Sequence, residues 1–238
     1  MAVYVYAVTL REHPCRLDGL TGVGSDAPPV RSLETEQLRA VVSDVDEEIR
    51  PKRRDLAAHQ AVLDRLLEDG TPLPLQFGYT AADDASVRRV LEEDAATYLD
   101  ALAGVQGCVE YNVKAGREED LLLREILDDS PRARLLNEEI RAGASDPRLS
   151  LELGQLVAAE VDVRRTNTST EVIRALAPLA REHVLHPPTG EDFLNLSLLV
   201  PRDDERAFLD AHAELTRDIE AGVRTRVAGP LPPYSFVP

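Results

Sequence analysis

Residues 3–9, Val-Tyr-Val-Tyr-Ala-Val-Thr, decide the fold class of this chain. The run is rich in β-branched and aromatic residues, which is typical of a β-strand. Side chains alternate across a strand, so Val3 and Val5 lie on one face while Tyr4 and Tyr6 lie on the other. Because both faces are apolar, the run predicts a central strand that is covered on both sides.

The rest of the first half predicts an open α+β domain around this strand. Residues 10–29 are rich in glycine and proline and form a loop. Two apolar stripes at helical spacing predict helices, one running from Leu56 to a stop at Gly70 and one from Val87 to Leu102, capped by Asp83 or Asp84. The remaining predicted strands are 38–45, 73–79 and 107–114, with a short one near 30–33. Together they favour a ferredoxin-like arrangement.

The second half predicts a helical middle and then a return to α+β. Helices are predicted at 116–128 and 131–142, interrupted by Pro131, and at 148–164 after a hinge. Thr168 and Glu171 form a capping box, which predicts the start of a further helix. A strand at 193–200, a helix from Phe208 to Ile219 and a strand at 223–227 complete the chain.

We therefore expect an α+β protein with two domains. Residues 1–115 form a modified ferredoxin-like α+β domain, residues 116–147 a helical linker region, and residues 148–238 a C-terminal domain with helices and a small α+β sheet. A proline-rich tail is docked on the C-terminal domain.

This tail, Gly-Pro-Leu-Pro-Pro-Tyr-Ser-Phe-Val-Pro at residues 229–238, is stiff, uncharged and contains two aromatic residues. A disordered tail would be poor in aromatic residues and rich in charge. Two interpretations stay open: the tail seals the protein's own core, or Tyr234 and Phe236 present an apolar handle to a partner. Tyr4 and Tyr6 are further candidates for partner binding, with a role in the core as their alternative.

Composition argues against several classes of partner. The 238 residues carry a formal net charge of −16, from 43 acidic and 27 basic residues. Binding to nucleic acid or to an anionic membrane surface requires clustered Lys and Arg, so this acidic charge argues against both partners. No apolar run reaches the length of a membrane span, and the apolar start lacks a basic leader, so we expect a soluble, cytoplasmic protein.

The sequence contains no convincing site for catalysis, a metal or a cofactor. Cys15 and Cys108 form no Cys-x-x-Cys motif, and Gly22-Val23-Gly24 is followed by prolines where a phosphate loop would need a helix. His13 shares a face with Cys15 if that segment is extended, but no further ligand lies nearby. The other polar candidates are better explained as a solvated loop rim (Asp44, Asp46, Glu47 and Glu48), as core or boundary histidines on apolar helix stripes (His59 and His212), or as opposite faces of an extended segment (His183 and His186). We expect a protein that is not an enzyme.

Several segments follow one another in an order that is more specific than any single motif. They are Val3-Tyr4-Val5-Tyr6, Gly19-Leu20 with Gly22-Val23, Leu38-Arg39-Ala40-Val41-Val42-Ser43, His59-Gln60-Ala61-Val62-Leu63, Leu73-Pro74-Leu75-Gln76-Phe77-Gly78, Gly107-Cys108-Val109-Glu110-Tyr111-Asn112-Val113-Lys114 and Gly229-Pro230-Leu231-Pro232-Pro233-Tyr234-Ser235-Phe236. In this order the chain resembles the GvpF/GvpL family of gas vesicle accessory proteins. It departs from the family's pattern at Leu231, where many relatives have tryptophan, and at Gln76, where a basic residue is usual.

The resemblance implies a minor gas vesicle component or assembly factor that binds the small hydrophobic shell protein, possesses no known catalysis and resides in the gas vesicle or the cytoplasm. Other gas vesicle accessory proteins are further implied partners, which leaves open a scaffold role. The alternative is a ferredoxin-like sensor of small ligands or a hydrolase. That alternative requires an inter-domain pocket lined by His183, His186, Arg224 or Arg226.

Overall fold

The computed structural model describes residues 1–46, 49–144 and 146–237. It divides into two compact units. The first unit comprises Met1–Tyr111, Leu199–Asp203 and Ala228–Pro238, and the second comprises Asn112–Leu198 and Asp204–Val227. The tail therefore groups with the N-terminal residues, whereas the sequence placed it with residues 148–238. The division at 115 and 147 into parts that fold on their own stays a prediction.

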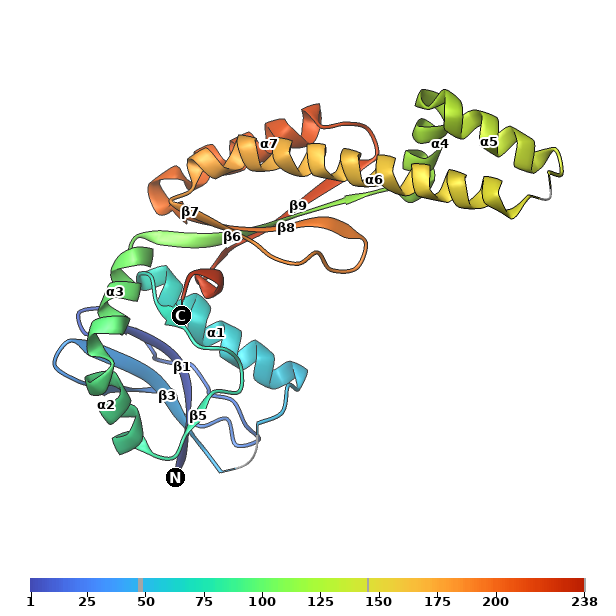
Figure 1. Cartoon of the computed structure of the whole chain (residues 1–238). Coiled ribbons are helices and arrows are strands. Elements are labelled where there is room, and N and C mark those ends of the chain that lie inside the picture. Colours follow the sequence, from blue (N-terminus) through green and yellow to red (C-terminus); the bar gives the residue numbers. More distant parts are fainter. Residues whose placement is uncertain (47–48, 145, 238) are drawn as a thin grey trace. The chain divides into compact units, whose positions relative to one another are not determined.

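The first unit is built on an antiparallel sheet with β1 (Ala2–Leu10) at its centre (Figure 1). Its order is β2-β3-β1-β4, with β2 at Arg31–Glu34, β3 at Leu38–Val45 and β4 at Leu73–Pro74, and β5 (Thr80–Ala81) also pairs with β1. The prediction of a central strand is confirmed. The single strand predicted at 73–79 is wrong, because the chain pairs with β1 only at its two ends and turns between them at Gly78, whose φ is +96°.

Three helices of the first unit cover the two faces of this sheet. α1 (Arg53–Asp69) packs Leu63 and Leu66 against the face that carries Tyr4 and Tyr6. α2 (Asp84–Glu93) and α3 (Ala95–Val105) pack against the face of the sheet that carries Val3 and Val5. The chain bends at Asp94, so the one helix predicted from Val87 to Leu102 is two helices in the structure.

The local signals at these helix ends are confirmed. Asp83 is the N-cap of α2 and accepts a hydrogen bond from the backbone N–H of Ser86. Gly70 follows α1 and donates its N–H to the carbonyl of Leu66. Leu56, which belongs to the predicted apolar stripe, is 44% exposed, so the buried stripe of α1 begins one turn later at His59.

The second unit contains most of a four-stranded sheet and a group of helices. The sheet has the order β7-β8-β6-β9, with β6 at Cys108–Arg117, β7 at Glu182–Leu185, β8 at Asp192–Pro201 and β9 at Val223–Leu231. Its helices are α4 (Glu119–Asp129), α5 (Pro131–Arg141), α6 (Pro147–Leu176) and α7 (Glu205–Asp218). Short 3-10 turns lie at Ala177–Leu179 and Arg202–Asp204. The α+β class with two antiparallel sheets is confirmed.

The prediction of a new helix at Thr168 is wrong. α6 runs without a break from Pro147 to Leu176, and Thr168 donates its hydroxyl hydrogen bond back to the carbonyl of Arg164, 3.0 Å away. The hydroxyl of a threonine inside a helix can thus form its hydrogen bond with a backbone carbonyl one turn earlier, and the capping-box spacing at Thr168 is coincidental. The true cap is Asp146, which accepts from the N–H of Arg148.

An ion-pair network joins the elements of the second unit. The Arg117 side chain, at the end of β6, is only 3% exposed and pairs with Glu125 of α4 and with Glu220 after α7. Its guanidinium holds the pKa of Glu220 below the usual range of a glutamate. Arg164 of α6 joins the same carboxylates and also pairs with Asp129.

Candidate functional site: the aromatic cluster and the C-terminal tail

Tyr4 and Tyr6 lie in the core of the first unit. Neither has exposed surface, and their ring centroids are 4.8 Å apart. The hydroxyl of Tyr6 bonds Ser43 Oγ at 2.8 Å and accepts the N–H of Val23, while the hydroxyl of Tyr4 accepts the N–H of Gly78. A side chain with no exposed surface offers nothing to a partner in this conformation, so these two residues act here as core.

His59 connects this buried cluster to the tail. Its Nδ1 lies 2.9 Å from the hydroxyl of Tyr4, and its Nε2 lies 3.0 Å from the hydroxyl of Tyr234. His59 is only 4% exposed, and burial lowers its pKa to about 4. The ring is therefore neutral near pH 7, so that one nitrogen donates and the other accepts. The chain of hydrogen bonds from Gly78 through Tyr4 and His59 ends at Tyr234.

The tail itself is held by two kinds of contact. The N–H and the hydroxyl of Ser235 donate to the carboxylate of Glu110 at 2.9 and 2.6 Å, and Glu110 is 4% exposed. Phe236 and Val237 pack against the core cluster on the α2–α3 face of the sheet, and Tyr234 packs against the cluster under α1. Residues Tyr234–Phe236 form a single 3-10 turn.

The backbone before the tail also requires a specific residue. Gly229 lies in β9, and a Cβ at this position would come within 2.4 Å of the Tyr111 ring, so only glycine fits. The structure thus places Tyr234 and Phe236 as half-buried residues on their own first unit. Their use as a handle for a partner stays a prediction.

A pocket of about 210 Å³ opens on the face of the first unit's sheet that is opposite Tyr4 and Tyr6. Side chains from β1, β3, β5 and α2 line it, together with Leu75, Tyr79 and Tyr98. Of these, Tyr79 is 50% exposed. No sequence pattern indicated this pocket, because it forms where the turn after β4 brings Tyr79 toward α2 and α3.

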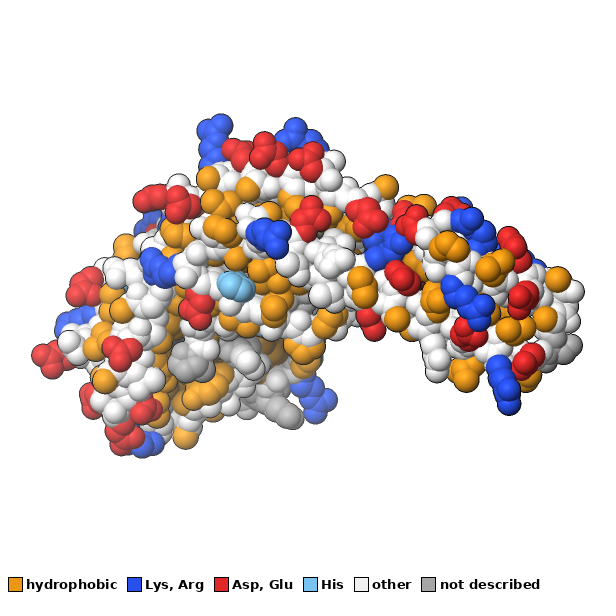
Figure 2. All heavy atoms as spheres, turned by 45° about the horizontal axis from the view of Figure 1, so that its top comes forward, with side chains coloured by type: hydrophobic (Ala, Val, Ile, Leu, Met, Phe, Trp, Pro, Cys, Tyr) orange, Lys and Arg blue, Asp and Glu red, His pale blue; other side chains and the backbone are white. Residues whose placement is uncertain are grey.

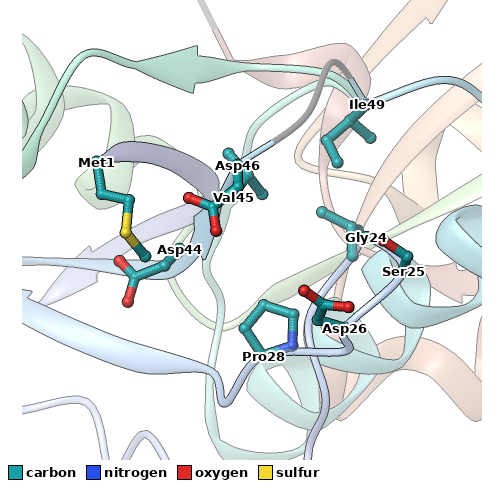
Figure 3. Close-up of a pocket in the computed structure, with 10 residues that line it drawn as sticks. Met1, Gly24, Ser25, Asp26, Pro28, Asp44, Val45, Asp46 and Ile49 are labelled. Carbon is teal, nitrogen blue, oxygen red and sulfur yellow. The ribbon is translucent and has the colours of Figure 1, made fainter.

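A second, smaller pocket of about 160 Å³ is lined by Met1, Asp26, Asp44 and Asp46 among others (Figure 3). Asp44 is bonded to Arg31 at 2.5 Å. In the part of the chain that the structure describes, no three His, Cys, Asp or Glu side chains are grouped closely enough to hold a metal ion. Glu47 and Glu48, which belong to the same predicted loop rim, lie outside the described residues.

The other polar candidates are dispersed. His13 bonds the backbone at Cys15 and at Leu66. In the second unit His186 bonds Ser197 Oγ at 3.1 Å, and Arg226 pairs with Asp192. His183 and Arg224 are exposed. Within the described residues, no helix is both long enough and apolar enough to cross a membrane.

Comparison with known proteins places the chain in a family. A family model described as "Gas vesicle synthesis protein GvpL/GvpF" matches residues 2–238. The chain belongs to the GvpL/GvpF family. A gas vesicle protein F from a Streptomyces species is 40% identical over 238 residues, which cover 100% of both chains. Gas vesicle protein L1 of Halobacterium salinarum is 28% identical over 92% of this chain and 84% of its own.

Solved structures show the GvpL/GvpF fold directly. The crystal structure of the gas vesicle protein GvpF from Anabaena sp. aligns with a TM-score of 0.86 at 22% identity, covering 99% of this chain and 97% of that one. GvpF from Microcystis aeruginosa aligns with a TM-score of 0.80 at 23% identity, covering 99% and 98%. At this identity the likeness establishes the fold alone. The names of the relatives describe gas vesicle proteins and no enzyme.

Proposed function

We propose that this chain binds the hydrophobic shell subunit of the gas vesicle while the vesicle forms, without making or breaking a covalent bond. The observation that carries this proposal is the match of a gas vesicle synthesis family to residues 2–238, nearly the whole chain. The protein acts in the cytoplasm or on the growing vesicle, either by holding free subunits for a short time or by sitting on the wall.

The physical need for such a protein follows from the chemistry of the wall. A subunit that builds a wall excluding water exposes apolar surface before assembly, so free subunits aggregate. A carrier with a net charge of −16 keeps the complex soluble, since like charges repel neighbouring complexes. On the face shown in Figure 2, acidic and basic side chains are interspersed with apolar ones.

The folded chain retains apolar surface that such a contact requires. In the first unit Tyr79 is 50% exposed and Leu56 is 44% exposed. In the second unit Leu135 and Leu151 are each more than half exposed. Single exposed apolar residues are normal on proteins, so these positions support the proposal only together with the family match.

Co-purification tests the proposal. The tagged full chain is produced together with the shell protein of its own gene cluster, and soluble shell protein in the eluate is measured. An unrelated tagged protein of similar size and charge serves as the control. We expect shell protein to stay soluble and to elute with this chain but not with the control protein. In a parallel pull-down from cells that produce the whole gene cluster, elution of other accessory proteins without shell protein would instead indicate a scaffold and contradict direct binding.

A further inference from the structure

The apolar pocket of the first unit lies between the sheet and α2. Its walls are formed by side chains from β1, β3, β5, α2, α3 and the residues on either side of β5: Val5, Val8, Ala40, Leu75, Tyr79, Thr80, Ala81, Ala82, Ser86, Val87, Val90, Leu91 and Tyr98. None of them is charged, although 29% of the residues of the chain are Asp, Glu, Lys or Arg. The pocket is therefore an uncharged opening on a strongly charged protein.

Its size and chemistry indicate the kind of group that fits. An apolar cavity of about 150 Å³ binds benzene, whereas pockets for drug-sized ligands and cofactors run to roughly 300–1,000 Å³. A volume of about 210 Å³ fits one aromatic or branched aliphatic side chain. A nucleotide would be too large, and its phosphates would meet no cation in the walls.

The rim of the pocket can bond a polypeptide that inserts such a side chain. Tyr79, which is 50% exposed, and Tyr98, which is half-buried, line the pocket, and within the described residues neither phenol donates to another side chain or to the backbone. Tyrosine is suited to interface rims because its ring packs while its hydroxyl bonds the partner. β5, which contributes Thr80 and Ala81 to the walls, pairs with β1 and with no other strand of the described residues.

We propose that this pocket takes one aromatic or branched aliphatic side chain of the gas vesicle shell subunit, with the main chain beside that residue bonded to Tyr79 and Tyr98. The inference rests on the proposed function and adds the place of contact. The shell subunit is the occupant that fits, because it is the partner that exposes apolar side chains before assembly, and because the uncharged walls would leave any ionised side chain unpaired.

Filling the pocket tests this inference. Val90 lines it from α2 and is half-buried, so Val90→Phe places a ring where the partner's side chain would go. The matched control is Val163→Phe, the same change at a residue of α6 in the second unit that is 56% exposed. Because one buried side chain accounts for about ten- to hundredfold in affinity, we expect capture of the shell protein to fall by that factor in Val90→Phe and to stay unchanged in Val163→Phe.

A second variant and a direct probe guard against loss of fold. Ser86→Leu fills the pocket from one turn earlier in α2, and circular dichroism and thermal melting report whether each variant folds. Benzene, added to protein with ¹³C-labelled valine and leucine methyl groups, should shift the resonances of Val87, Val90 and Leu91 in the wild type. It should leave them unshifted in the filled variants.

The outcomes separate the two proposals. Loss of capture in a folded filled variant supports the pocket. If folded Val90→Phe and Ser86→Leu both capture shell protein as well as the wild type, the pocket is not the contact, although shell binding stands. If benzene shifts no methyl resonance in the wild type, the pocket does not accept an apolar group and the inference fails. If the wild type captures no shell protein, both proposals fail.

Discussion

The substitution Tyr234→Phe tests whether the tail is an energetic part of the first unit. It removes only the hydroxyl that lies 3.0 Å from His59 Nε2 and leaves the ring in place. His59 is 4% exposed, so its ring nitrogen loses a partner at a site that water reaches poorly. A buried polar group left without a hydrogen bond costs about 1–3 kcal/mol.

That cost translates into a measurable change in melting temperature. For a chain of this length, 1 kcal/mol lowers the melting temperature by about 2–4 °C, so we expect a decrease of roughly 2–12 °C for the transition of the first unit. Urea unfolding followed by circular dichroism gives the same quantity independently, as a lower midpoint at an unchanged slope.

The matched control is Tyr79→Phe, which removes a hydroxyl that is bonded to no described residue from a side chain that is 50% exposed. We expect its effect on stability to stay within about 0.5 kcal/mol, as for most surface substitutions. Equal melting temperatures for Tyr234→Phe, Tyr79→Phe and the wild type would refute the reasoning, because the tail hydroxyl would then add nothing to the folded unit.

Three further predictions concern pH, glycine and the buried arginine. Burial lowers the pKa of His59 to about 4, so between pH 6.5 and 4 the unfolded chain binds a proton that the folded chain does not. The urea midpoint should therefore fall as the pH is lowered from 6.5 to 4. His59→Gln should make the midpoint less dependent on pH in this range. Gly222→Ala should destabilise the protein by about 1–3 kcal/mol in thermal melts, because the φ of Gly222 is +80° and a Cβ there would lie 2.6 Å from Leu121. Gly154→Ala in α6, where nothing lies within 4 Å of the added Cβ, should stabilise it by about 0.5–1 kcal/mol. Arg117→Met should cost about 1–3 kcal/mol by the urea midpoint, because Glu125 and Glu220 then keep only Arg164, at 3.7 and 3.8 Å. An unchanged midpoint would show that Arg117 adds nothing to the stability of the second unit.

The sequence predicted those parts of the fold that depend on local pattern. The sequence predicts β1 as a central strand because both of its faces are apolar. It predicts a cap at Asp83 or Asp84, of which Asp83 is the N-cap, because such a side chain needs only the backbone three residues on. The same kind of local argument gave the wrong result at Thr168, because its hydroxyl bonds the carbonyl of Arg164 one helical turn earlier instead of capping a new helix.

The candidate site depended on contacts that no local pattern reports. Tyr234 meets His59 across 175 positions of sequence, and Ser235 meets Glu110 across 125. Glu110 is a charged residue of β6, yet it is buried and bonds Ser235 of the tail. The apolar pocket is a gap between elements, and gaps follow from how side chains of distant segments fill space.

Photo-crosslinking in cells that are making vesicles tests shell binding most directly. Lysine-directed reagents have little to react with, since Lys52 and Lys114 are the only lysines. A photoreactive amino acid is therefore placed in turn at the exposed apolar positions 56, 79, 135 and 151. We predict an adduct with the shell subunit, strongest from position 79. Adducts from every position that contain only other proteins would contradict the account.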